Sequence, residues 1–208
     1  MTTRSYELVD QAVEQTTPVI KRIANEVWRF AELSLQEIKS AQLIINILQE
    51  QGFTITSKGT AGVPTAFIAE YGFGTPTLGF LVEYDALPGL GNESVPYREP
   101  RKDQVTSGHG CGHNLLGAGS IGAATALKYV LTEQKIPGTI RVYGCAAEET
   151  EGAKVYMARE GLFKDLDAAL HWHPSPSAEV SNYRSAAVDQ IKIEFFGKGA
   201  HAGGSPWL

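Results

Sequence analysis

The feature that most constrains the fold of this 208-residue chain is an alternation of short apolar strands with helical segments. Strands are expected at residues 53–56, 65–69, 78–82, 139–145 and 168–172. Helices are expected at residues 8–30, 37–51, 114–133 and 152–160, and Pro18 predicts a kink or break in the first of them. This alternation predicts an α/β domain in which the Ala- and Gly-rich third helix packs closely on the sheet.

Composition limits the classes of protein that the chain can belong to. With 43% hydrophobic and 20% charged residues, it can bury the core of one large domain, or of one domain and part of another. The net charge of −5 and the absence of long like-charge blocks argue against a nucleic-acid surface. Neither a signal-peptide core nor an apolar run of roughly 18 residues is found, so we expect a cytoplasmic protein with no membrane partner.

A short Gly-His-Gly-Cys-Gly-His-Asn segment at residues 108–114 carries the strongest chemical signal. Cys111 and His113 stand two residues apart, and the surrounding glycines allow a turn tight enough to direct both side chains to one point. Thiolate and imidazole are ligands of borderline-soft divalent metals such as zinc. Because Cys111 sits in this loop and only Cys145 remains, a disulfide framework is not expected and a reducing compartment fits better.

Two adjacent carboxylates, Glu148 and Glu149, follow the strand expected at residues 139–145. The ends of strands are where α/β sheets usually carry their sites. Adjacent side chains point in different directions, so one carboxylate could bind a metal while the other takes a proton from water and returns it to a leaving amine. This pair therefore favours amide hydrolysis, although two acidic residues near a helix start also suit the helix dipole.

Other polar residues lie at the ends of the expected strands. His171 and His173 fall on the same face of the last strand, and spacing alone does not choose between them as a ligand. Asp85 follows the apolar strand at residues 78–82, where a carboxylate could orient a ligand imidazole. The long polar stretch at residues 88–107 is too rich in Gly, Pro and charge for a regular element and leads directly into the metal-type loop.

The glycines of residues 117–122 match the spacing of a dinucleotide-binding fingerprint. That fingerprint should follow a buried strand and precede an acidic residue by about 20 positions, whereas here a His/Cys/Gly loop comes first and Val142 stands near the acidic position. We therefore expect no dinucleotide. Close packing of a helix on a sheet explains these small residues.

Five motifs together resemble the zinc aminoacylase and carboxypeptidase family, in particular its amidohydrolase branch, which includes indole-acetyl-amino-acid, hippurate and p-aminobenzoyl-glutamate hydrolases. The motifs lie at residues 30–37, 83–89, 111–114, 147–149 and 197–202. Their order and spacing cover nearly the whole chain. The resemblance implies a three-layer α/β/α sandwich that holds two divalent metal ions, with zinc expected and manganese or cobalt also compatible.

The resemblance also implies roles for individual residues. It makes Cys111, His113, Glu149 and His171 metal ligands, with Cys111 bridging the two metals. It makes Glu148 the general base and places Asp85 near the metals. His201 matches a histidine that, in this family, reaches the active site of the partner subunit, so the resemblance implies a homodimer for the full-length protein.

The chain matches only the amino-terminal portion of such proteins. We expect a catalytic metal-binding domain at residues 1–184 and the start of an inserted α+β lid or dimerisation domain at residues 185–208, opened by a strand at 188–196. The rest of the lid and a final histidine ligand would lie beyond residue 208, so the chain is expected to be a fragment. Residues 92–106 look like an insertion ahead of the metal-type loop.

The sequence therefore predicts a metal-dependent hydrolase of amide bonds in N-acyl amino acids or small dipeptide-like substrates. Two alternatives stay open. Cys111 could be the nucleophile of a thiol hydrolase, although a histidine two residues away does not supply the separate base that such enzymes build. The chain could also be a non-catalytic fragment that binds metal or a small molecule.

Overall fold

The structure is a computed structural model that describes residues 3–180, 186–189 and 191–207. The chain divides into two compact units, Met1–Ser175 and Pro176–Leu208. The domain boundary expected between residues 184 and 185 lies outside the described residues.

The first unit is built on a five-stranded mixed sheet with the strand order β1-β2-β4-β3-β5. β1 pairs with β2 and β2 with β4 in antiparallel fashion, whereas β3 pairs with β4 on one side and β5 on the other in parallel fashion. The strands are β1 Thr54–Lys58, β2 Phe67–Phe73, β3 Thr77–Val82, β4 Gly138–Gly144 and β5 Ala168–Leu170. All five expected strands are confirmed, but the last ends two residues earlier than predicted, so His171 and Trp172 follow the sheet.

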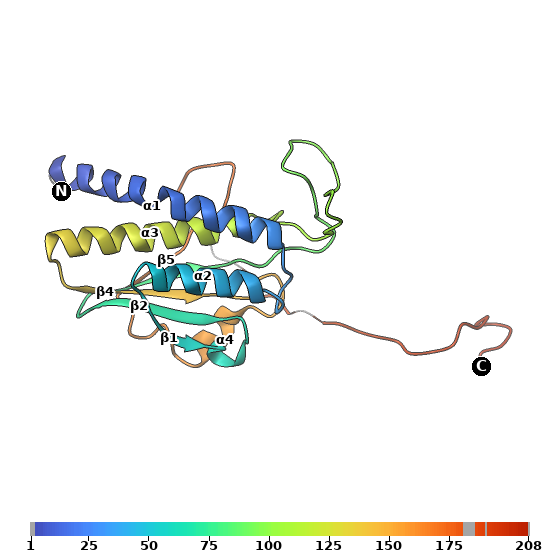
Figure 1. Cartoon of the computed structure of the whole chain (residues 1–208). Helices are drawn as coiled ribbons and strands as arrows, with labels where there is room; N and C mark the ends of the chain where they lie inside the picture. Colours follow the sequence, from blue (N-terminus) through green and yellow to red (C-terminus); the bar gives the residue numbers. More distant parts are fainter. Residues whose placement is uncertain (1–2, 181–185, 190, 208) are drawn as a thin grey trace. The chain divides into compact units, whose positions relative to one another are not determined.

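Helices cover both faces of the sheet (Figure 1). α1, α2 and α3 lie on one face, and α4 lies on the other, which confirms the predicted three-layer α/β/α sandwich. Their bounds are α1 Thr3–Phe30, α2 Ile38–Glu50, α3 His113–Gln134 and α4 Ala153–Arg159, with a short 3₁₀ turn η1 at Thr60–Gly62. Fully buried apolar side chains such as Ile44, Val82, Ile121 and Val142 join these helices to the sheet in one core. Burial of this apolar surface is the main force that stabilises the sandwich.

α1 runs as one helix from Thr3 to Phe30 and contains Pro18, so of the predicted kink or break at this residue the break is wrong and the kink stays a prediction. A proline removes one backbone donor from a helix, but tertiary packing of the apolar face can compensate for that loss. Here Ile23 and Val27 are fully buried on the carboxy-terminal side of Pro18, and Ala12 is fully buried on the amino-terminal side. Contacts on both sides of the proline therefore hold the helix together.

The segment at residues 88–107 contains no helix or strand, as predicted, and is closed at its base by backbone hydrogen bonds. Leu87 and Gly108 donate to each other's carbonyl at 3.0 Å, and Gly91 N donates to Thr106 O at 2.8 Å. Arg101 is buried, and its guanidinium donates to the carbonyls of Trp28 and Arg29 at the end of α1. The loop, green in Figure 1, is thus fastened to the helical layer.

α3 packs unusually close to its neighbours because of its glycines. A Cβ added at Gly117 would lie 2.6 Å from the carbonyl oxygen of Glu83, and one at Gly122 would lie 2.4 Å from Ile20 of α1. These contacts confirm that the glycines serve packing. By length and composition α3 could cross a membrane, but half of that stretch is buried inside the unit, as in a core helix.

The second unit contains little regular structure among its described residues. The prediction of a strand at residues 188–196 is wrong for the residues that the structure describes there, because residues 188–189 and 191–196 form no strand. A strand requires a hydrogen-bonded partner, and none is paired with this segment among the described residues. Near the end of the chain, Gly204 N and Ser205 N donate to the carbonyl of His201 and form a turn.

The close approach at Gly117 predicts that Gly117→Ala will lower the free energy of unfolding by about 1–3 kcal/mol, as expected for overpacking. The added methyl group meets backbone rather than a flexible side chain, so α3 itself must shift. Urea denaturation measures the change. Ala123→Val, which enlarges a residue on the exposed side of the same helix, is the control, and an equal loss in both variants would contradict the packing argument.

Candidate metal centre

Polar residues gather at one edge of the sheet because three parallel strands end there. Glu83 and Asp85 follow β3, Glu148 and Glu149 follow β4, and His171 follows β5. α3 begins at the same edge with His113. Carboxyl ends of parallel strands are the usual position of a site in α/β proteins. The fold therefore brings together residues that are up to 88 positions apart in sequence.

His113 stands at the centre of this cluster and is fully buried. Its Nδ1 lies 2.8 Å from Asp85 Oδ1; because a carboxylate only accepts, Nδ1–H donates, and Nε2 is left to face the cluster. Nε2 lies 3.1 Å from Glu83 Oε2, 3.6 Å from Glu148 Oε2 and 3.9 Å from Glu149 Oε1, but forms no hydrogen bond. A buried imidazole nitrogen without a partner, aimed at carboxylate oxygens, is an arrangement that a bound cation would satisfy.

Asp85 fixes the orientation of His113 and of the turn beside it. Asp85 Oδ2 accepts hydrogen bonds from Ser34 Oγ at 2.8 Å and from the backbone N–H of Glu149 at 2.9 Å. Burial acts to raise the pKa of Asp85, but the bonds from His113 and Glu149 outweigh it, so the pKa is lowered and the carboxylate stays ionised. The structure places Asp85 in the position predicted for a residue that orients an imidazole.

Cys111 contacts His173 rather than His171. Cys111 Sγ lies 3.2 Å from His173 Nε2, and His173 Nδ1–H donates to the carbonyl of Pro174, so Nε2 carries the free lone pair. His171 Nε2 instead lies 2.9 Å from Glu83 Oε1. Two groups of ligand atoms are close enough to share an ion among the described residues: Cys111, His113 and His173, and Glu83, His113 and Glu148.

The structure places His171 and His173, between which the sequence could not choose a ligand, in different surroundings. His173 stands in the group with Cys111, whereas His171, favoured by the resemblance, is hydrogen-bonded to a carboxylate at the edge of the second group. Both histidines are exposed. His171 stays a predicted ligand, and His173 joins it as a candidate.

Glu83 is the site residue that sequence reasoning missed. Its side chain is only 2% exposed, and it contacts Lys154, His171 and His113. Burial acts to raise its pKa, but the hydrogen bond from His171 and the charge of Lys154 together lower the pKa to about 2. The sequence carried a signal for this residue, because an acidic residue directly after an apolar strand is uncommon unless it has a partner.

Glu148 and Glu149 lie on a turn that a buried carboxylate supports from the far side. Ala147, just before them, has a positive φ of 54°, and its N–H donates to Glu37 Oε1 at 2.7 Å. The second oxygen of Glu37 accepts from Thr65 Oγ1 at 2.8 Å. Glu37 is fully buried just ahead of α2, so it ties the helical layer to the turn that presents Glu148 and Glu149.

Electrostatics at the cluster favour a cation. Burial, followed by the charge of Glu149, raises the pKa of the Cys111 thiol to about 11. Burial, followed by the charge of Glu83, raises the pKa of Glu148 above its ordinary value. Each carboxylate or thiolate therefore makes ionisation of the others harder, and a divalent metal would reverse this effect. The free Nε2 of His113, the thiol and the carboxylates together fit a zinc-type ion.

His201 belongs to the second unit, where its Nδ1 accepts a hydrogen bond from Gly204 N at 2.9 Å. Its side chain is exposed. The role implied for it at a partner's active site stays a prediction.

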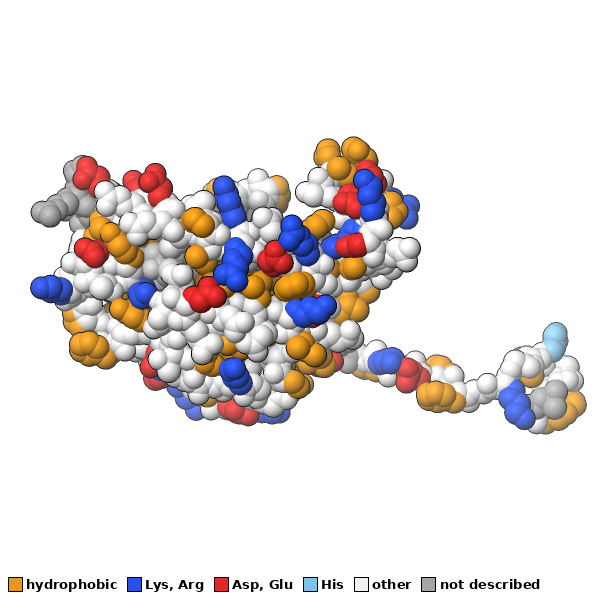
Figure 2. Space-filling model, in the orientation of Figure 1, with side chains coloured by type: hydrophobic (Ala, Val, Ile, Leu, Met, Phe, Trp, Pro, Cys, Tyr) orange, Lys and Arg blue, Asp and Glu red, His pale blue; other side chains and the backbone are white. Residues whose placement is uncertain are grey.

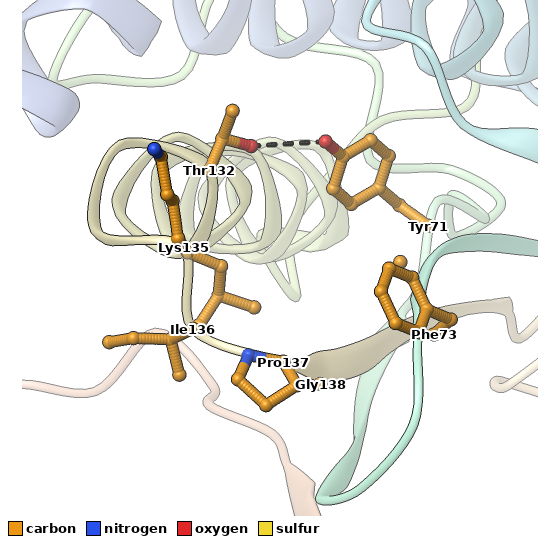
Figure 3. A pocket seen from close by; sticks show the side chains of 9 residues that line it. Tyr71, Phe73, Thr132, Lys135, Ile136, Pro137 and Gly138 are labelled. Carbon is orange, nitrogen blue, oxygen red and sulfur yellow. Dashed lines mark hydrogen bonds between the residues drawn. The ribbon is translucent and has the colours of Figure 1, made fainter.

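A cavity of about 550 Å³ lies far from these residues, at the carboxy-terminal end of α3 (Figure 3). α3 is 22 residues long, so its two ends are about 30 Å apart. The cavity is lined by Tyr71, Gly72, Phe73, Leu131, Thr132, Lys135, Ile136, Pro137 and Gly138. Since none of these residues is His, Cys, Asp or Glu, the cavity offers no metal ligand.

The visible surface of the sandwich carries interspersed charges of both signs (Figure 2).

Thiol, imidazole and carboxylate groups at the carboxyl edge of an α/β sheet are donors that a zinc-type metal accepts. The family model described as peptidase family M20/M25/M40 matches residues 79–205, which is more than half of the chain. The chain therefore belongs to peptidase family M20/M25/M40. This finding confirms the family relationship predicted from the five sequence motifs.

Similar proteins include several hydrolases. The chain is 40% identical over 203 residues to a subunit of the p-aminobenzoyl-glutamate hydrolase of Escherichia coli, a match that covers 98% of the chain and 42% of that protein. It is 27% identical over 190 residues to hippurate hydrolase of Campylobacter jejuni, covering 87% of the chain and 47% of that protein. The chain thus spans less than half the length of these relatives.

A solved structure supports the fold. The Bacillus subtilis YXEP protein, described as a dinuclear metal binding peptidase from the M20 family, superposes with a TM-score of 0.64 at 24% identity. That match covers 78% of the chain and 44% of the solved one.

The buried bonds of Glu37 predict that Glu37→Ala will lower the free energy of unfolding by about 2–4 kcal/mol, because Ala147 N–H and Thr65 Oγ1 lose their partners. Urea denaturation measures the loss. Glu50→Ala is the matched control, since Glu50 forms only an exposed ion pair at the end of α2. Similar losses in the two variants would show that Glu37 does not support the turn.

Glu37→Gln should change the pH dependence of stability in a defined direction. Burial raises the pKa of Glu37, so its contribution to stability is present at low pH and is lost as the pH rises through that raised pKa. The free energy of unfolding of Glu37→Gln should therefore increase relative to that of the wild type as the pH rises through the raised pKa of Glu37. A difference in free energy of unfolding between the two proteins that does not change with pH would contradict the assigned direction.

Proposed function

We propose that the chain carries the metal-binding part of a hydrolase that cleaves the amide bond of N-acyl amino acids or small dipeptide-like substrates. The observation that carries this proposal is the buried, unpartnered Nε2 of His113, which faces Glu83, Glu148 and Glu149 within 3.9 Å. In this arrangement His113, Glu83 and Glu149 can serve as metal ligands, and Glu148 can accept a proton beside them. The names of the relatives, which include hydrolases of p-aminobenzoyl-glutamate and hippurate, support the substrate class.

The proposed metal ligands are Cys111, His113 and Glu149, together with His171 or His173. A divalent metal bound there supplies Lewis acidity, which makes water more acidic and polarises an amide carbonyl. Zinc suits the thiol and imidazole donors best. The second ion of the proposal comes from the family resemblance, because the two ligand groups share His113, whose Nε2 can bind only one ion.

Glu148 is proposed to handle the proton. Its side chain is 37% exposed, so it reaches both the cluster and solvent, and its raised pKa brings it closer to the operating range of a general base. In this role a carboxylate oxygen of Glu148 takes the proton of the attacking water and later delivers it to the nitrogen of the leaving amine. Asp85 holds His113 in the tautomer that keeps Nε2 free.

The setting of the full-length protein is also part of the proposal. We infer a cytoplasmic homodimer in which His201 contributes to the partner's active site. The proposed role of the Cys111 thiol as a metal ligand, which oxidation would abolish, supports a reducing compartment.

A thiol hydrolase that uses Cys111 as nucleophile is less well supported. A reactive cysteine needs a lowered pKa, whereas burial and neighbouring carboxylates raise the pKa of Cys111 to about 11. Tight metal binding without turnover in the full-length protein would instead favour a non-catalytic binding module.

Removal of the proposed thiol ligand should remove metal. Cys111→Ala is expected to lower zinc content, measured by elemental analysis after dialysis, by at least half, because Cys111 lies in one of the two ligand groups. Cys145→Ala is the matched control, because Cys145 is buried in the apolar core and should leave metal content unchanged. Unchanged zinc in Cys111→Ala would remove the thiol from the ligand set.

Removal of the proposed base should remove turnover but not metal. Glu148→Gln in the full-length protein is expected to lower kcat for an N-acyl amino acid by about 10²–10⁴-fold at unchanged metal content. Glu151→Gln alters an exposed neighbouring carboxylate and serves as the control. If Glu148→Gln retained most of its activity, another residue would have to be the base.

A further inference from the structure

The buried carboxylate of Glu83 has two oxygens with different surroundings. Oε1 contacts the ammonium of Lys154 and lies 2.9 Å from His171 Nε2. Oε2 lies 3.1 Å from His113 Nε2, which forms no hydrogen bond. One oxygen is thus contacted by Lys154 and His171, while the other faces Nε2 of a buried histidine that has no hydrogen-bond partner. A cation shared by Nε2 and Oε2 would give both buried atoms a partner.

We propose that Lys154 is a positioning residue of the metal centre, whose ammonium holds Glu83 Oε1 so that Oε2 becomes an additional ligand of the cation bound by His113. This inference rests on the proposed function only in requiring that a divalent cation binds at this edge of the sheet. It adds a carboxylate ligand and a supporting cation to the residues that the motifs indicate.

The position of Lys154 suits this role. It lies in the first turn of α4, on the face of the sheet opposite α3, and its side chain is only 28% exposed. Burial acts to lower the pKa of Lys154, but the charge of Glu83 outweighs it and raises the pKa, so the ammonium stays charged. A fixed partner inside the protein restricts the carboxylate more strongly than exchanging water would.

The balance of charge gives Lys154 a second reason to be present. Carboxylate oxygens of Glu83, Asp85, Glu148 and Glu149 all lie within 3.9 Å of the His113 ring nitrogens. The Lys154 ammonium contacts this group through Glu83 and offsets part of its negative charge.

The test is the affinity of the full-length protein for Co²⁺, measured by competition with a chromophoric chelator and by the visible absorption of bound Co²⁺. Glu83→Gln and Lys154→Met are each expected to weaken binding by about 10–100-fold, the usual effect of losing a ligand or its supporting partner. Lys154→Arg keeps the charge and should recover most of the affinity. Lys164→Met, which removes an exposed lysine after α4, is the control and should bind as the wild type does.

The double variant separates a coupled pair from two independent effects. If Lys154 acts through Glu83, then Glu83→Gln combined with Lys154→Met should bind Co²⁺ no more weakly than Glu83→Gln alone. Additive losses would overturn the proposal. So would an unchanged or tighter Co²⁺ affinity in Lys154→Met, because Lys154 would then only repel the cation. If Lys154→Met fails to fold, the comparison of Lys154→Gln with Lys154→Arg decides in the same way.

These outcomes differ from a failure of the proposed function. A wild type that binds Co²⁺ and shows the predicted coupling, yet cleaves no amide, would overturn the hydrolase assignment and leave the role of Lys154 intact. Amide cleavage together with a Co²⁺ affinity that does not respond to Lys154→Met would overturn the role of Lys154 alone. A wild type that binds no Co²⁺ would overturn both.

Discussion

The buried contact between His113 and Asp85 is the interaction on which the rest of the site depends. Asp85 accepts from the His113 ring, from Ser34 after α1, and from the backbone of Glu149 after β4. One carboxylate therefore holds together the start of α3, the segment after α1 and the acidic turn. Because both side chains of the pair are fully buried, loss of either would leave an uncompensated polar group, a cost of several kcal/mol.

The sequence was sufficient for whatever depends on local pattern. Alternating periodicity placed every strand and helix of the sandwich, and the spacing of Cys111 and His113 predicted a metal-type loop. Pairings across the fold could not be found in this way: Glu83 meets Lys154 over 71 positions, and Glu37 meets Ala147 over 110. Periodicity also could not separate His171 from His173, because that choice depends on β5 ending at Leu170. Pro18 does not break α1, because packing on both sides outweighs one lost hydrogen bond.

Two layers of support distinguish this centre from a simple cluster of acidic side chains. On the face covered by α1, α2 and α3, Glu37 holds the backbone of Ala147, and Asp85 holds His113 at the start of α3. On the face covered by α4, Lys154 contacts Glu83. The groups that face the centre are thus fixed from both faces of the sheet, as preorganisation of a binding site requires. The three-layer architecture itself supplies this support, since either layer alone would leave part of the cluster free to turn toward water.

The closed base of the loop at residues 88–107 separates the length of this loop from the spacing of the ligand residues that follow it. Leu87 and Gly108 are locked together by a reciprocal pair of backbone hydrogen bonds, and Cys111 and His113 follow at once. Chain inserted or deleted at the tip of the loop, away from the buried Arg101 that fastens it to α1, lengthens or shortens a closed ring without changing the geometry of its junction with the sheet. The loop can therefore diversify as a separate module at the rim of the centre while the spacing of the ligand residues is inherited unchanged.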